Sequence, residues 1–286
     1  MEGTMEQSLS PGALKLIDLA LDEDAGRGDV TTRLTVPADA IGEGRVIAKA
    51  DVVISGLAAF EAVMRRVDAR IKVARRVSDG DAVERNAVIL TADGPLASLL
   101  VAERTALNFL QRLSGVATLT RRFVATLPPG SKAVIADTRK TTPGMRGLEK
   151  IAVLHGGGRN HRADLAGGVL IKENHIAAAG SIVAAIARCR EGAPHSLRVE
   201  VEVQSEDDLR SAIDAGADAV LLDNMDPERI RRCAEIAGGR VVLEASGGVT
   251  LETVAAIAAA GVDVISVGAL THSAPAADLS FLLEGA

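Results

Sequence analysis

Aromatic and sulfur-containing side chains are scarce in this sequence. Its 286 residues include no Trp or Tyr, only four Phe and only two Cys. Stacking of nucleic-acid bases needs aromatic platforms, so the composition argues against a nucleic-acid ligand. Cys189 and Cys233 stand alone, with no CxxC or Cys/His spacing. We therefore expect reduced thiols, rather than a disulfide or a zinc site.

Long apolar runs are also missing. The longest, Val254 to Val262, is far too short to span a bilayer and is ended by Asp263. The segment from Met1 to Leu14 is acidic and polar, without the basic and apolar regions of a secretory signal. We expect no membrane partner and a cytoplasmic protein.

Positive charge is concentrated in one stretch of an acidic chain. The formal net charge is −6, yet residues 132–172 contain eight Lys or Arg and only three Asp or Glu. A compact cationic patch predicts a small polyanionic ligand, because nucleic acids usually need a broad basic face. Arginines suit bidentate capture of carboxylates, whereas a Lys acts as a point charge towards phosphate.

The first part of the chain has the pattern of a small α+β domain. Helical spacing covers residues 12–22 and 57–67, and short β-rich runs cover 45–50, 71–77 and 87–91. We expect these runs to form an antiparallel sheet. A long helical pattern follows over residues 97–127, with a break expected near Ser114-Gly115.

The second part alternates apolar strands with short helical segments. Its strand candidates are residues 133–137, 168–172, 198–203, 219–223, 240–245 and 263–268. Ser205, Asp226 and Thr250 mark helix starts between the later strands. Such units are typical of parallel βαβ structure, and six of them predict an α/β barrel that is incomplete rather than eightfold.

The carboxyl ends of these strands carry the polar residues. In α/β folds this edge of the sheet binds ligands, since all the strand ends converge there. Two glycine-containing turns, Ser246-Gly247-Gly248 and Gly268-Ala269, follow late strands and predict a phosphate cradle of backbone N–H groups. Glycine after a strand is otherwise simply a turn residue.

Two acidic residues alternate with valines in residues 199–203. Glu200 and Glu202 must point the same way, because side chains in a strand repeat every second residue. If the barrel is correct, both face inward. Glu202 and Asp223, at neighbouring strand ends, can hold sugar hydroxyls or Mg²⁺. Alternatively, they balance Lys140 and Lys172 in an ion-pair network.

Seven motifs together resemble the quinolinate phosphoribosyltransferase (carboxylating nicotinate-nucleotide pyrophosphorylase) family across essentially the whole chain. They occur at residues 23–32, 102–108, 137–144, 156–162, 170–175, 221–224 and 244–248. The resemblance implies transfer of phosphoribosyl from phosphoribosyl pyrophosphate (PRPP) to quinolinate with decarboxylation, in de novo NAD biosynthesis. The products are nicotinate mononucleotide, CO₂ and pyrophosphate.

The resemblance also implies domains and an assembly. An N-terminal open-faced antiparallel sandwich domain is expected over residues 1–117 and a C-terminal α/β barrel with the active site over 118–270. Residues 271–286 would return to the N-terminal domain. The family implies an obligate homodimer with shared active sites.

Site residues carry over position by position. Arg104, Arg139, His161 and Arg162 are assigned to the quinolinate carboxylates, and Thr138 to substrate binding. Lys140, Lys172, Glu202 and Asp223 would act catalytically around the ribose and pyrophosphate, with Mg²⁺ held directly or indirectly by the two carboxylates. The 5′-phosphate site comprises Ser246, Gly247, Gly248, Val267, Gly268 and Ala269. Glu202 is favoured over Glu200, although a loop of variable length leaves both open.

Three alternatives remain at this point. A molybdenum-associated paralogue family shares the fold and much of the motif pattern, but differs where this chain has Lys172-Glu173-Asn174-His175. A non-catalytic phosphate-binding barrel would not need the arginines that clamp carboxylates. A phosphosugar isomerase barrel would leave the first 120 or so residues unexplained.

Overall fold

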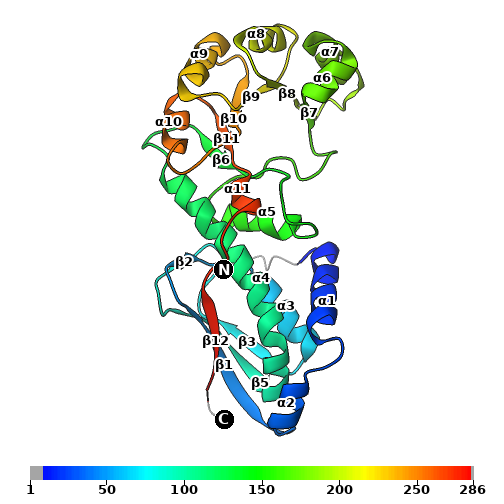
Figure 1. The fold of residues 1–286 in the computed structure, drawn as a ribbon, viewed down its shortest axis with the longest axis vertical. Helices are drawn as coiled ribbons and strands as arrows, with labels where there is room; N and C mark the ends of the chain where they lie inside the picture. Colours follow the sequence, from blue (N-terminus) through cyan, green and yellow to red (C-terminus); the bar gives the residue numbers. More distant parts are fainter. Residues whose placement is uncertain (1–8, 285–286) are drawn as a thin grey trace, which may run out of the picture. The chain divides into compact units, whose positions relative to one another are not determined.

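The structure, a computed structural model, describes residues 9–284 and consists of two compact units (Figure 1). The N-terminal unit contains residues 9–121, 141–157 and 273–284, and the barrel unit contains residues 122–140 and 158–272. The domain ranges expected from sequence also include residues 1–8 and 285–286, which lie outside the described residues. The segment 141–157, expected in the barrel domain, is grouped with the N-terminal unit.

The helices that begin in the N-terminal unit follow the apolar spacing of the sequence. Ser10 caps the first, since its Oγ accepts a hydrogen bond from the Ala13 amide and Pro11 occupies the first turn. Ile17 is fully buried on the inner face of this helix. The helices are α1 (Pro11–Ala25), α2 (Val30–Thr35), α3 (Leu57–Val67), α4 (Leu96–Ala125) and α5 (Arg146–His155).

A four-stranded antiparallel sheet forms the other layer of this unit, in the order β12-β1-β5-β3. A separate antiparallel pair joins β2 to β4. The last strand in sequence pairs with the first, so that Phe281 lies opposite Val46. The antiparallel sheet expected from sequence is confirmed. The strands of this unit are β1 (Ile41–Ala48), β2 (Val52–Val53), β3 (Lys72–Arg75), β4 (Ala82–Val83), β5 (Val88–Pro95) and β12 (Leu279–Glu284).

The helix break expected at Ser114-Gly115 is wrong. Helix α4 continues without interruption to Ala125. Gly115 has a different purpose, because a Cβ at this position would collide with the backbone carbonyl oxygen of Pro275. The glycine allows the segment leading to β12 to cross the helix closely, which is a packing role rather than a helix-breaking one.

Six parallel strands form the sheet of the barrel unit, in the order β6-β11-β10-β9-β8-β7. The incomplete barrel is confirmed: β6 and β7 end the sheet, and Arg159 extends its edge beside β6. The Arg159 amide donates to the Ile135 carbonyl at 2.8 Å, and the Asp137 amide donates to the Arg159 carbonyl at 3.1 Å. The strands are β6 (Val134–Ala136), β7 (Val169–Ile171), β8 (Val199–Val203), β9 (Ala219–Asp223), β10 (Val242–Ser246) and β11 (Val264–Ser266).

Helices cover the outer face of this sheet, and α7 to α10 follow its curve in Figure 1. Ser205 and Asp226 cap α8 and α9 through hydrogen bonds to backbone amides, as expected from sequence. The alternation in β8 is also confirmed, since its valines are buried and its glutamates are half-buried. The helices are α6 (Glu173–Ala179), α7 (Ile182–Gly192), α8 (Glu206–Asp214), α9 (Pro227–Ala237), α10 (Val254–Ala259) and α11 (Ala269–His272).

Among residues 9–284, no helix combines the length and the apolar character needed to cross a membrane.

Candidate active site

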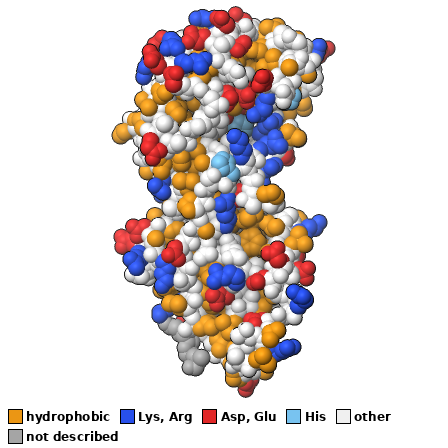
Figure 2. All heavy atoms as spheres, in the orientation of Figure 1, with side chains coloured by type: hydrophobic (Ala, Val, Ile, Leu, Met, Phe, Trp, Pro, Cys, Tyr) orange, Lys and Arg blue, Asp and Glu red, His pale blue; other side chains and the backbone are white. Residues whose placement is uncertain are grey.

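A cavity of about 530 Å³ lies at the carboxyl ends of the parallel strands, wholly within the barrel unit. Figure 2 shows Lys and Arg side chains, with acidic ones beside them, gathered on one side of this unit. Every residue predicted for the site except Arg104 lines the cavity. These residues are Thr138, Arg139, Lys140, His161, Arg162, Lys172, Glu202, Asp223, Ser246, Gly247, Gly248, Val267, Gly268 and Ala269.

Arg104 lies on α4 in the N-terminal unit. Its side chain is 58% exposed, and its guanidinium lies 4.0 Å from the carboxylate of Glu103, the limit of an ion pair. Burial raises the pKa of Glu103, and Arg104 partly opposes this shift. Arg104 therefore does not line the cavity of its own barrel unit.

The cationic wall of the cavity combines neighbouring guanidinium groups with a lysine. Burial and the proximity of Arg139 lower the pKa of Arg162, whose Nη1 donates to the Gly168 carbonyl at 2.9 Å. Two guanidinium groups this close repel each other, and a dianion between them would relieve the repulsion. Lys172 is paired with Glu202, with 3.2 Å between Nζ and Oε2.

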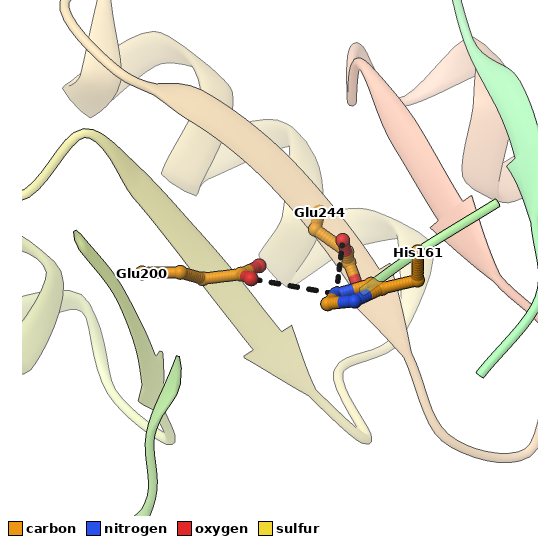
Figure 3. Close-up of side chains that lie close together, drawn as sticks. All are labelled: His161, Glu200 and Glu244. Carbon is orange, nitrogen blue, oxygen red and sulfur yellow. Dashed lines mark ion pairs between the residues drawn. The ribbon is translucent and has the colours of Figure 1, made fainter. Parts of the chain in front are cut away.

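His161 is held from three sides. Its backbone amide donates to Oδ1 of the buried Asp137 at 2.8 Å, and its Nδ1 accepts from the Arg162 amide at 2.7 Å. Its Nε2 lies 3.4 Å from Oε2 of Glu200 and 3.5 Å from Oε2 of Glu244 (Figure 3). These three side chains have the spacing of a metal site.

The ring's hydrogen bonds argue against a metal there. A metal-binding His usually donates from its second nitrogen, but Nδ1 here accepts a hydrogen bond, so a neutral ring carries its proton on Nε2. Hydrogen bonds that Nε2 donates to Glu200 and Glu244 raise the pKa of His161, and burial raises the pKa of Glu200. The cluster of His161, Glu200 and Glu244 therefore tends to retain protons. Because Nδ1 already accepts a hydrogen bond from the Arg162 amide, these protons lie between Nε2 and the two carboxylates.

Glycines at the other wall permit close approaches. Gly247 has φ of 92° and Gly248 has φ of 61°, a region that L side chains rarely adopt. A Cβ on Gly247 would also collide with the side-chain amide of Asn224. A Cβ on Gly268 would come 3.1 Å from the Lys140 side chain. The Thr271 hydroxyl, in α11, donates to the Lys140 carbonyl at 2.8 Å and fixes that backbone.

Glu202 and Asp223 offer carboxylate oxygens to the cavity from neighbouring strands. Both line the cavity, and they end the neighbouring strands β8 and β9. The Glu202 carboxylate faces Lys172, and the Asp223 carboxylate accepts a hydrogen bond from the side-chain amide of Asn224 at 2.9 Å. Two carboxylates at the rim of a polar cavity fit Mg²⁺, which prefers oxygen ligands and retains several waters.

Some lining residues were not predicted. They are Leu170, Leu221, Asn224, Glu244, Val249, Thr250, Ser266 and His272. Glu244 was detectable, since it lies two residues before Ser246 in β10 and therefore points to the same face. A charged residue inside an apolar strand is a useful signal in itself, because an unpaired buried charge is costly.

Known proteins share both units of this chain. The protein-family model described as "Quinolinate phosphoribosyl transferase, N-terminal domain" matches residues 29–114. The family model of the C-terminal domain matches residues 116–282. A Bacillus subtilis relative, named probable nicotinate-nucleotide pyrophosphorylase [carboxylating], is 42% identical over 93% of this chain and 91% of its own. The chloroplastic enzyme of that name from Arabidopsis thaliana is 41% identical over 94% of this chain and 82% of its own.

Solved structures agree with the sequence relatives. Nicotinate-nucleotide pyrophosphorylase from Francisella tularensis has a TM-score of 0.92 at 40% identity, covering 96% of this chain and 98% of its own. The Ehrlichia chaffeensis protein of that name has a TM-score of 0.91 at 35% identity, covering 97% and 100%. With matches to both domain models and to full-length relatives, this chain belongs to the quinolinate phosphoribosyltransferase family.

Proposed function

We propose that this chain transfers the phosphoribosyl group of PRPP to quinolinate, releasing pyrophosphate and CO₂ and forming nicotinate mononucleotide for NAD biosynthesis. The observation that carries the proposal is the cavity itself. It is lined by guanidinium groups, by glycine turns and by two carboxylates from the neighbouring strands β8 and β9. This arrangement suits one dicarboxylate and one phosphorylated sugar in the same space.

Arg139 and Arg162 are proposed to bind the quinolinate carboxylates. Their fork-shaped donors match carboxylate geometry, and their mutual repulsion favours a dianion. Holding the pyridine ring against the sugar turns a bimolecular reaction into one between positioned groups, which is a large part of catalysis in such transfers. No acid–base dyad is needed for attack by the ring nitrogen on the ribose carbon.

The phosphate groups of PRPP are proposed to bind the glycine turns and the lysines. Backbone N–H groups around Gly247 and Gly268 form a cradle for the 5′-phosphate. Lys140 and Lys172 would neutralise the pyrophosphate as it departs. Glu202 and Asp223 would stabilise the positive charge that develops on the sugar.

Mg²⁺ is the proposed cofactor, with Glu202 and Asp223 holding it directly or through water. When bound, it would supply positive charge that neutralises the leaving pyrophosphate. Lys172 pairs with Glu202 in the structure. With substrates and metal bound, Glu202 would instead face the metal and the sugar, and Lys172 would face the pyrophosphate.

A homodimer with shared active sites is proposed as the working form. Its support is Arg104, an exposed cation on a helix with largely apolar neighbours, outside the unit that contains the cavity. In this arrangement Arg104 reaches the quinolinate pocket of the partner subunit.

One assay tests the proposed function. The protein is incubated with PRPP, Mg²⁺ and quinolinate labelled in its 2-carboxylate, and nicotinate mononucleotide and labelled CO₂ are measured. Both products should appear in equal amounts. Absence of both, from a protein whose circular dichroism shows a folded chain, would contradict the proposal.

A further inference from the structure

We propose that Glu200 and Glu244 are positioning residues for the substrate clamp: they orient the His161 ring so that it holds the backbone of Arg162. This inference rests on the proposed function, because the clamp is assigned to quinolinate. It gives a role to one buried and one half-buried carboxylate that substrate binding and metal binding leave unexplained.

The two glutamates reach His161 from strands on either side of β9. Glu244 in β10 lies beside Leu221 of β9, and Glu200 in β8 lies beside Ala219 of the same strand. Their side chains are only 6% and 12% exposed, and the His161 side chain is 16% exposed. Figure 3 shows both carboxylates directed at the same edge of the imidazole.

The direction of each hydrogen bond fixes the ring. The Arg162 amide can only donate, so Nδ1 of His161 must be an unprotonated acceptor. The ring proton is then on Nε2, where the two carboxylates are its neighbours. Replacing either carboxylate with a neutral amide would remove one of the two charged acceptors at Nε2, and the tautomer with the proton on Nδ1 would become more competitive. In that tautomer, the Nδ1–H of His161 and the Arg162 amide N–H would face each other as two donors, and the hydrogen bond to the Arg162 amide would be lost.

Arg162 connects this cluster to the cavity. Its amide is fixed by His161, and its guanidinium is fixed by the Gly168 carbonyl at 2.9 Å. Both His161 and Arg162 line the cavity. Bidentate recognition of a carboxylate depends on the placement of the guanidinium plane, so movement of the Arg162 backbone would weaken it.

Burial of two carboxylates beneath a cavity for a dianion is costly, which argues against a passive role. Each glutamate has one carboxylate oxygen, Oε1, that is buried and makes no hydrogen bond to the described residues. Groups of this kind are rare in folded proteins, and each one calls for a specific explanation. Keeping the ring proton of His161 on Nε2 provides such an explanation, because this tautomer is favoured by negative charge beside Nε2.

The first test reads the tautomer in the full-length wild-type protein. The protein is labelled with ¹⁵N-histidine, and the His161 signals are assigned by their loss in His161→Gln. We expect a protonated Nε2 and an unprotonated Nδ1 at pH 7. A proton on Nδ1, either in the opposite tautomer or in a doubly protonated ring, would overturn the proposal without any need for a glutamate variant to fold.

The second test separates binding of the two substrates. Glu200→Gln and Glu244→Gln should each raise KM for quinolinate about 10-fold or more, with KM for PRPP within about twofold of wild type. Their His161 signals should shift towards the Nδ1-protonated form. Glu235→Gln, an exposed glutamate in α9, is the matched control and should change neither quantity.

Two results for the Michaelis constants would contradict the proposal. Wild-type KM for quinolinate in both variants, or an equal rise in KM for both substrates, would overturn the positioning role. If wild-type protein does not use quinolinate at all, the proposed function fails instead. In that case the tautomer and its dependence on the two glutamates still report on the cluster itself.

Discussion

The Nζ atom of Lys172 lies 3.2 Å from Oε2 of Glu202, across the ends of the neighbouring strands β7 and β8. The lysine side chain is 51% exposed and the glutamate side chain 14%. Each charge therefore has a partner at the edge of the cavity. Because the lysine end of the pair is exposed to solvent, we expect Lys172 to contribute little to stability, so it can be tested without unfolding the protein.

Lys172→Ala should fold normally and lose most of its activity, by about 100-fold or more, because it removes positive charge opposite the leaving group. Lys15→Ala is the matched control, since Lys15 is exposed on α1 in the other unit. Circular dichroism and initial rates measure the two effects. An unfolded Lys172→Ala protein would show that the residue is structural.

Nicotinate, which lacks the 2-carboxylate, should be a poor substrate. The cavity has at least two guanidinium groups, more than one carboxylate requires. A hydrogen bond between charged groups contributes roughly 1.5–3 kcal/mol, so use of nicotinate should fall about 10- to 100-fold. Competition assays at equal concentrations measure this ratio. Equal turnover of the two acids would rule out a dicarboxylate clamp.

Removal of divalent cations with EDTA should abolish turnover, and added Mg²⁺ should restore it. Glu202 and Asp223 offer oxygen ligands at the cavity rim, whereas the packing of the barrel strands does not depend on them. The melting temperature should therefore stay unchanged while the rate falls. Full activity in EDTA would mean that the lysines alone neutralise the pyrophosphate.

Arg104→Ala and Lys172→Ala, each inactive alone, should restore activity when mixed and allowed to exchange subunits. In a mixed dimer with shared sites, one site collects both lesions and the other is intact. After random exchange of equal amounts, about half of the dimers are mixed, so up to about a quarter of all sites are active. Lys140→Ala mixed with Lys172→Ala is the control. Both lysines lie in the same unit, so no intact site can form. Verified exchange without recovery would place Arg104 in its own subunit's site.

Gly115→Ala should destabilise the protein, although alanine is the better helix former. The added Cβ would meet the Pro275 backbone oxygen, and either α4 or the segment before β12 would have to move. Overpacking of this kind typically costs about 1–3 kcal/mol. Gly147→Ala in α5 has nothing within 4 Å of the new Cβ and should be neutral or stabilising. Thermal unfolding measures both.

Local pattern was enough to predict the six parallel strands and the edge of their sheet that carries the cavity, whereas β2, β4 and β12 were not predicted. The range 219–223 was predicted to the residue, because a buried parallel strand is apolar throughout and a charge marks its end. Helix α3 was also predicted to the residue, since its apolar positions repeat at helical spacing.

Relationships between distant segments were not predicted. The contact between Gly115 and Pro275 turns an apparent helix breaker into a packing position, and nothing near Gly115 in the sequence reveals it. The same holds for the convergence of Glu200 and Glu244 on His161, which depends on strands from separate βαβ units. Alternation places a side chain on a face, but only the strand order identifies its neighbour.

The pairing of β12 with β1 has a consequence for folding during synthesis. A ribosome releases β1, β5 and β3 first, and β12 emerges only after all six barrel strands. Until then, β1 exposes an unpaired edge on which other nascent chains can add a strand. Chains that stall within the barrel would therefore be prone to aggregate through their N-terminal sheet, and a separate peptide covering residues 273–284 should suppress this.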